Sequence, residues 1–191
     1  MKKLLLILVV LCITGTSLFA WEPNYLTKFP LGQNGKNWIL NLGMGFPDFN
    51  KYKDVYYVPP VRLSLDKNVE MGDKKLPFFF GGILIYEGHG YKELKWSYAK
   101  GYYYENVYYH DFSIGGRVGY HFNWGVNNLD TYAVSTVGWV IQTGDYIDPG
   151  LFLYGVNIGA RYFVSKGFGF WVEGGFNTSN VNLDIGLAFK F

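Results

Sequence analysis

The sequence predicts an all-β chain whose strands close into an eight-stranded antiparallel up-and-down barrel. Three observations support this: apolar residues recur with a period of two, no stretch keeps the spacing of an amphipathic helix, and 20% of the residues are aromatic while 17% are charged. The 191 residues fit a single domain. This composition excludes disordered and disulfide-rich chains.

The first twenty residues have the order of a secretory signal peptide. Two lysines precede an apolar run over 4–13, and we expect cleavage after Ala20. The run is about half of the ~20 residues that a membrane-spanning helix needs, which argues against an anchor. Cys12, the one cysteine, follows Leu11 inside the run, where a lipoprotein signal has a small residue. We therefore expect neither lipidation nor disulfides in the exported chain.

The charges of the chain exclude two classes of partner. There are 17 Lys and Arg against 15 Asp and Glu, and two of the lysines lie in the expected signal peptide. The remaining charges are scattered, with no basic face and no cluster of lysines. We expect no nucleic-acid binding and no attachment to a membrane surface through charge.

Five segments alternate cleanly between an apolar face and a face of small or polar residues. They are 37–46, 108–122, 151–164, 168–177 and 181–191. In the last of them, Val181, Leu183, Ile185, Leu187, Phe189 and Phe191 share one face. Half-buried strands give this pattern.

Three further strands complete the set but fit less well. We place them near 54–66, 76–87 and 130–141. Pro59 and Pro60 each lack a hydrogen-bond donor, so we expect a bulge or an extension beyond the membrane at that point. The segments 76–87 and 130–141 are apolar on both faces, and their sequence leaves the register open.

The apolar face also changes along each strand, with aromatic residues near the ends and aliphatic residues in the middle. Two aromatic belts around an aliphatic band are typical of a transmembrane barrel, whereas a soluble sandwich mixes its aromatics along the buried face. A soluble lipocalin-like barrel is the alternative, but its ligand cavity needs an apolar interior. We therefore expect a cleaved signal peptide over 1–20, a periplasmic lead over 21–36 and an outer-membrane barrel over 37–191.

With both ends on the periplasmic side, the odd-numbered connections face outward. They are 47–53, 88–107, 142–150 and 178–180. The longest contains Trp96, Tyr102, Tyr103 and Tyr104, which could bind a host molecule or neighbouring lipopolysaccharide. The simpler interpretation, which we favour, is that these aromatics pair across a β-hairpin that rises above the membrane.

The inward-facing residues include all three arginines of the chain and two acids. They are Arg62, Arg117, Arg161, Glu173 and Asp184. An eight-stranded barrel is just wide enough to be filled by side chains, and buried charges must be paired. A tight turn after Ser165 would place Gly159 opposite Glu173 and Arg161 on the diagonal. We expect an Arg161–Glu173 ion pair that plugs the lumen, with a gated solute path as the alternative.

No catalytic or metal-binding pattern emerges. His89 stands at the start of the longest connection, where we expect solvent; His110 has lipid-facing parity, and His121 points inward near the periplasmic end. Asp111 follows His110 directly, so the two point to opposite faces. No Ser, His and acid share a face and depth, and no metal-ligand spacing or phosphate loop appears. We expect no enzyme, no cofactor and no metal.

A resemblance to a known family rests on three places near the end of the chain. They are Gly159–Phe163, Glu173–Phe176 and the final strand with Phe189 and Phe191. The chain resembles small bacterial outer-membrane barrels of the OmpW, OmpX and OmpA-barrel type. The recognisable sequence motifs are confined to about the last forty residues. The resemblance implies outer-membrane lipid and lipopolysaccharide as surroundings. It also implies assembly by the barrel-assembly machinery through the C-terminal strand. Because this chain ends with the predicted barrel, we expect no peptidoglycan-binding domain of the kind that some OmpA-like proteins carry.

The expected function is a structural or surface-exposed role for an integral outer-membrane barrel with a polar-plugged lumen. The alternative is a passive channel for small solutes. OmpW-like relatives would imply lateral passage of apolar compounds, although no lining residue can be matched. We regard an adhesin, a lipid A-modifying enzyme and a soluble lipocalin-like barrel as weaker alternatives.

Overall fold

The computed structural model describes residues 38–46, 56–71, 74–122, 124, 126, 128–145, 150–178 and 181–191. The expected signal peptide and periplasmic lead lie outside the described residues. The strands are β1 (Trp38–Gly45), β2 (Tyr56–Met71), β3 (Lys74–Ser97), β4 (Gly101–Phe122), β5 (Leu129–Gly144), β6 (Leu151–Phe163), β7 (Phe168–Asn177) and β8 (Val181–Lys190).

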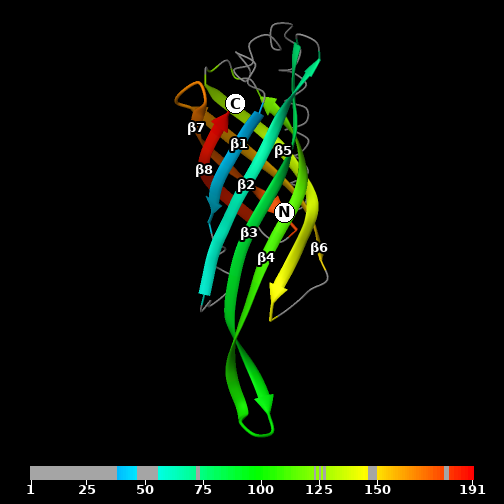
Figure 1. The fold of residues 1–191 in the computed structure, drawn as a ribbon, viewed down its shortest axis with the longest axis vertical. Helices are drawn as coiled ribbons and strands as arrows, with labels where there is room; N and C mark the ends of the chain where they lie inside the picture. Colours follow the sequence, from blue (N-terminus) through cyan, green and yellow to red (C-terminus); the bar gives the residue numbers. More distant parts are fainter. Residues whose placement is uncertain are drawn as a thin grey trace, which may run out of the picture.

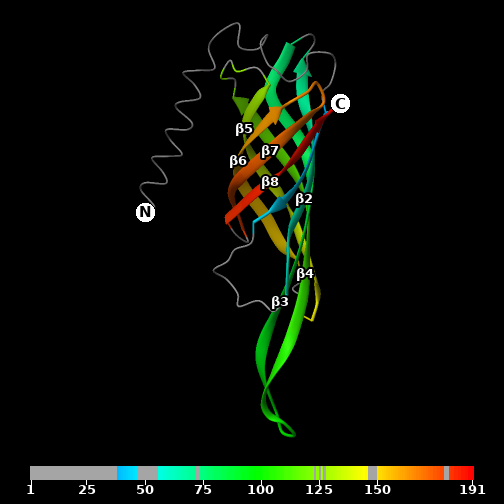
Figure 2. The ribbon, with the colours of Figure 1, turned by 90° about the vertical axis from the view of Figure 1, so that its left-hand side faces the viewer.

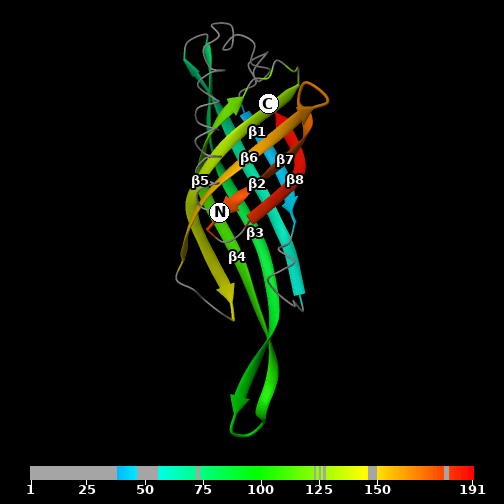
Figure 3. The same ribbon diagram turned by 180° about the vertical axis from the view of Figure 1, so that it is seen from behind.

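These eight strands form one closed barrel in sequence order, with every neighbouring pair antiparallel (Figures 1 and 3). Closure is made by β1, which pairs with β2 on one side and with β8 on the other. Backbone hydrogen bonds of 3.0 Å in both directions between Trp38 and Phe191 continue the β1–β8 ladder past its last strand residue. The predicted fold, an eight-stranded up-and-down barrel, is confirmed.

The predicted 88–107 connection is wrong, because most of it is strand. β3 continues to Ser97 and β4 starts at Gly101, and only residues 98–100 form the turn. Gly101 has a φ of +68°, a backbone conformation that glycine adopts without strain. Figure 2 shows the resulting hairpin projecting well beyond the other strands, at the end of the barrel opposite the C-terminus. The favoured interpretation of its aromatics as cross-strand pairs fits this hairpin, since Trp96 pairs with Tyr102.

The two prolines of β2 lie at an irregularity in the sheet. The β2–β3 register shifts between Val58 and Val61, and β1 pairs with β2 only from Val61 onward. Pro59 and Pro60 therefore need not donate to a regular ladder on either side. The expected bulge is present.

The two segments of ambiguous register are apolar on both faces because the barrel interior has apolar layers of its own. In β3, Phe79 and Ile83 are buried inside while Phe78, Phe80 and Leu84 are about half exposed outside. In β5 the buried residues Tyr132, Val134 and Val140 alternate with the exposed Val137, Trp139 and Ile141. The expectation of a mostly small or polar interior is therefore incomplete.

The exterior carries two aromatic belts separated by aliphatic residues. The belt near the C-terminal end includes Trp38, Phe78, Phe80, Tyr162, Phe170 and Phe191. The belt toward the hairpin includes Phe46, Phe112, Trp139, Phe152, Tyr154 and Phe176. Between them the exposed side chains include Leu42, Ile114, Val118, Val156, Ile158 and Ile185. A closed barrel with this exterior and a polar interior has the architecture of bacterial outer-membrane proteins.

Within the described part of the chain, no helix is both long enough and apolar enough to cross a bilayer.

Candidate functional site

Glu173 of β7 is the centre of a polar network inside the barrel. Its side chain is 0% exposed, and each carboxylate oxygen accepts two hydrogen bonds. Oε1 accepts from Arg62 at 2.7 Å and from Asn157 at 2.9 Å. Oε2 accepts from Arg117 and from the Tyr132 hydroxyl, both at 2.7 Å. A buried carboxylate that is fully hydrogen-bonded and paired with two arginines is tolerated where an isolated one would not be.

A second group of residues surrounds Arg161 of β6. Its guanidinium donates to Asp130 at 2.9 Å and to Asn41 at 3.0 Å, and it forms a short ion pair with Asp66. Asp130 in turn lies 2.6 Å from Nδ1 of His121. These side chains come from strands all round the barrel, so the network ties together elements that share no ladder.

Arg117 of β4 joins the two groups. Its Nε lies 3.1 Å from Asp66 while its Nη2 donates to Glu173. The rings of Phe79 and Tyr132 lie beside this junction, and the Arg161 guanidinium carbon is 4.1 Å from the centre of the Tyr132 ring. The three arginines are 0–2% exposed, so the network is buried inside the barrel.

The expected ion pair between Arg161 and Glu173 does not form. Gly159 does lie directly opposite Glu173 across β6 and β7, as predicted. However, Glu173 is held by Arg62 and Arg117, whereas Arg161 pairs with Asp66 and Asp130. The diagonal argument considered only β6 and β7. Arg161 pairs instead with Asp130, its direct partner on the other neighbouring strand, and with Asp66 across the lumen.

A separate apolar group lies inside the barrel toward its C-terminal end. Ile39, Phe163, Trp171 and Ala188 form a buried apolar cluster there. The Lys190 ammonium lies 4.5 Å from the centre of the Phe163 ring, which places a charge at the rim of this cluster.

On the hairpin side of the network the lumen widens into a small cavity of about 50 Å³. Its lining includes Arg62, Glu87, His89, Asn182 and Asp184. Arg62 bridges the cavity and the network, because it contacts Asp184 at 3.0 Å as well as Glu173. We call this cavity the outer vestibule.

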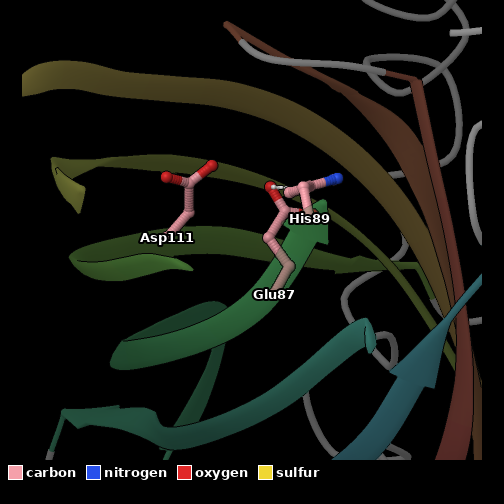
Figure 4. Close-up of side chains that lie close together, drawn as sticks. All are labelled: Glu87, His89 and Asp111. Atoms are coloured by element: carbon pink, nitrogen blue, oxygen red, sulfur yellow. Dashed lines mark ion pairs between the residues drawn. The ribbon is translucent and has the colours of Figure 1, made fainter. Parts of the chain in front are cut away.

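The structure brings together three side chains of types that can ligate a metal, which the sequence patterns did not group. Glu87 and His89 rise side by side from β3, and Asp111 stands on the neighbouring strand (Figure 4). One ligand atom of each lies within 4.8 Å of the others. The expectation that His89 is solvated is wrong, since the residue is 8% exposed. The signal was the i, i+2 spacing of Glu87 and His89, which becomes informative once the hairpin register places Asp111 opposite Glu87.

The aromatic residues of the long connection separate onto two faces of the hairpin. Trp96, Tyr102 and Tyr104 lie on one face and are 53%, 76% and 71% exposed. Tyr103 has the opposite parity, and Lys100 lies 5.2 Å from the centre of its ring. The sequence-based group of four is therefore three residues on one face and one on the other.

The two C-terminal aromatics have lipid-facing parity. The Phe189 ring packs 5.6 Å from that of Phe168 on the adjacent strand. Phe191 is 56% exposed in the belt at this end.

Comparisons with known proteins find similarity in the fold. No protein-family model and no curated protein match the chain. The structure is similar to that of Neisserial surface protein A, at 16% identity with a TM-score of 0.49, covering 81% of this chain and 95% of that one. It is also similar to the Yersinia pestis outer membrane protein Ail, at 12% identity with a TM-score of 0.45, covering 82% and 99%. The E. coli outer membrane protein W is similar at 8% identity with a TM-score of 0.46, covering 82% and 98%.

Proposed function

We propose that the chain is an integral outer-membrane protein that carries no solute through its lumen and acts through the β3–β4 hairpin on the cell surface. The observation that carries this proposal is the polar network around Glu173. A water-filled pore needs a continuous open path, but three arginines, the acids that pair with them and Tyr132 are buried across the lumen. The barrel is accordingly a support, and what it supports is the hairpin.

The hairpin has the composition of a contact surface. Its exposed face presents an indole and two phenol rings, which make large contacts at a low cost in side-chain entropy. Two lysines, Lys92 and Lys100, lie on the same hairpin, while the third, Lys95, is paired with Glu105 and Glu93. Rings and ammonium groups together suit a phosphorylated glycolipid such as lipopolysaccharide, the molecule that surrounds an outer-membrane barrel.

The experiment that tests this function combines topology with binding. The refolded chain should be extractable from vesicles only by detergent and should shift on a gel when boiled. Protease added outside intact cells should cut at the hairpin turn, residues 98–100. Changing Trp96, Tyr102 and Tyr104 together to serine should keep the gel shift and lose binding to lipopolysaccharide-containing vesicles. Recovery of the chain in water would contradict the membrane placement, and unchanged binding would contradict the role of the hairpin.

A second candidate is lateral passage of small apolar solutes, and one observation favours it. An apolar groove of about 420 Å³ lies on the exterior, lined by side chains that include Val61, Leu63, Leu84 and Ile114. It lies next to the Pro59–Pro60 bulge and shares Ile85 and Ser113 with the lining of the outer vestibule. Ile85 and Ser113 therefore contribute atoms to both the vestibule and the exterior groove.

Uptake of a small aromatic fluorophore into lipid vesicles tests the second candidate. Filling the groove with Val61→Trp should abolish a protein-dependent uptake, while Val137→Trp, on the exterior of β5, should leave it intact. Equal uptake with and without the protein would eliminate lateral passage.

A further inference from the structure

We propose that Glu87, His89 and Asp111 form a binding site for one divalent transition-metal ion, of the zinc class, at the outer mouth of the barrel. Two carboxylates and one imidazole are ligands for such ions, whereas Mg²⁺ and Ca²⁺ prefer oxygen ligands alone. The site goes beyond the proposed function, which involves no metal.

The first argument is the spacing of the ligand atoms. Nε2 of His89 lies 3.6 Å from Oε1 of Glu87. Two ligand atoms bound about 2.1 Å from one tetrahedral zinc ion are roughly 3.4 Å apart. The Asp111 carboxylate completes a set in which all ligand atoms lie within 4.8 Å of one another, so a side-chain rotation brings the third oxygen to the ion.

The second argument is electrostatic. Glu87 and Asp111 are directly opposite each other in the β3–β4 ladder, and like charges in that position destabilise a sheet. Among the described residues, no lysine or arginine forms an ion pair with either carboxylate. A divalent cation would compensate both charges at once.

The same hairpin contains a matched case in which the repulsion is compensated. Glu93 and Glu105 are also directly opposite in this ladder. There Lys95 lies between them, 2.8 Å from Glu105 and 3.7 Å from Glu93. At Glu87 and Asp111 the corresponding neighbour is His89, whose imidazole can bind a metal ion where an ammonium cannot.

The third argument is that the surroundings are built for a cation. His89 is held between aromatic rings, with centres 5.3 Å away at Tyr57 and 5.0 Å away at Tyr109. Gln142 donates to Asp111 at 2.9 Å and orients its carboxylate, as residues around a metal commonly do. Glu87 and His89 also line the outer vestibule, where the 1% exposed Asp184 has an Oδ1 atom without a hydrogen-bond donor. The vestibule therefore presents carboxylate oxygens of Glu87 and Asp184, with Arg62 as the cation on its other side, 3.0 Å from Asp184.

The test is calorimetric titration of the tag-free chain, refolded in detergent and stripped with EDTA, with Zn²⁺ at pH 7.5. We expect one equivalent to bind, and Co²⁺ in its place should give visible absorption bands with a nitrogen ligand. Mg²⁺ and Ca²⁺ should bind at least about tenfold more weakly. Absence of Zn²⁺ binding, or equal binding of Ca²⁺, would overturn the proposal and leave a His89–Glu87 ion pair in its place.

Variants assign the ligands. Glu87→Gln, His89→Gln and Asp111→Asn should each weaken Zn²⁺ binding by more than about tenfold, and Gln142→Leu by about tenfold. Glu105→Gln, from the compensated pair, and His110→Gln, on the other face of β4, are the controls and should bind as the unmodified chain does. Without metal, Glu87→Gln and Asp111→Asn should melt no lower than the unmodified chain, because each removes a repulsion. Binding that persists in all three ligand variants, or that is lost in the controls, would place the ion elsewhere.

Discussion

The Arg117 guanidinium lies 2.7 Å from the Glu173 carboxylate, although the two residues come from β4 and β7, strands that share no ladder. This pair joins two walls of the barrel through its interior. The position of β4 relative to β7 therefore depends on a side-chain contact, and the contact bears on stability as well as on passage.

Replacing Glu173 by Gln should strongly destabilise the barrel. The amide leaves Arg62 and Arg117 without their shared carboxylate, and breaking a buried ion pair from one side costs about 3–5 kcal/mol. Thermal unfolding in detergent, followed by circular dichroism and by the gel shift, measures the effect. Glu105→Gln on the exposed hairpin is the control and should change the melting temperature little. An unchanged melting temperature for Glu173→Gln would contradict a structural role for the network.

A double-mutant cycle should separate the observed pairs from the one expected from the sequence. Arg117 and Glu173 are in contact, so their coupling should lie toward the upper end of the about 0.5–3 kcal/mol that interacting residues show. Arg161 pairs with Asp66 and Asp130 instead, and its direct coupling to Glu173 should be clearly smaller. Leucine in place of each arginine and glutamine in place of Glu173 give the two cycles. A larger coupling for Arg161 would favour the diagonal pair.

Adding a methyl group at Gly159 should disturb the network through Tyr132. A Cβ there would overlap Cζ and lie 2.5 Å from the hydroxyl of that ring, which donates to Glu173. Gly159→Ala should destabilise the barrel by about 1–3 kcal/mol, the usual cost of overpacking. Gly116→Ala is the matched control, because its Cβ would meet no atom closer than 4.0 Å. Equal melting temperatures for the two variants would argue against this packing.

The titration of Lys95 on the hairpin should depend on its contact with Glu105. The side-chain hydrogen bond from Lys95 to Glu105 raises the pKa of Lys95 above its ordinary value. Because the folded pKa is raised, the contact stabilises the hairpin below the ordinary lysine pKa and is lost as the pH rises through the folded value. NMR titration of the lysine side chains should show the pKa of Lys95 falling in Glu105→Gln. A pKa that does not move would show that the contact is absent in solution.

The fold could be predicted because the alternation of residue types along each strand distinguishes its inward from its outward face. The period of two placed Arg62, Arg117, Arg161, Glu173 and Asp184 on the inward face, where the structure has them buried. Arg161–Asp130 was missed because the register of the segment 130–141 was left open, although the two are direct partners in the β5–β6 ladder. The pairs across the lumen could not be predicted, because they depend on how all eight strands are staggered. The position of Asp111 opposite Glu87 was missed for a related reason. It follows from the register of the β3–β4 hairpin, which the turn at 98–100 sets. Treating 88–107 as a loop left that register undefined.

Single-channel recording of the refolded chain in planar bilayers, after a gel shift on boiling has shown that the barrel is folded, tests the central claim most directly. The closed network around Glu173 predicts bilayers without discrete conductance steps at any voltage that the membrane withstands. Reproducible steps from the unmodified chain would show that the lumen conducts, and would contradict the assignment of this barrel as a closed support for its hairpin.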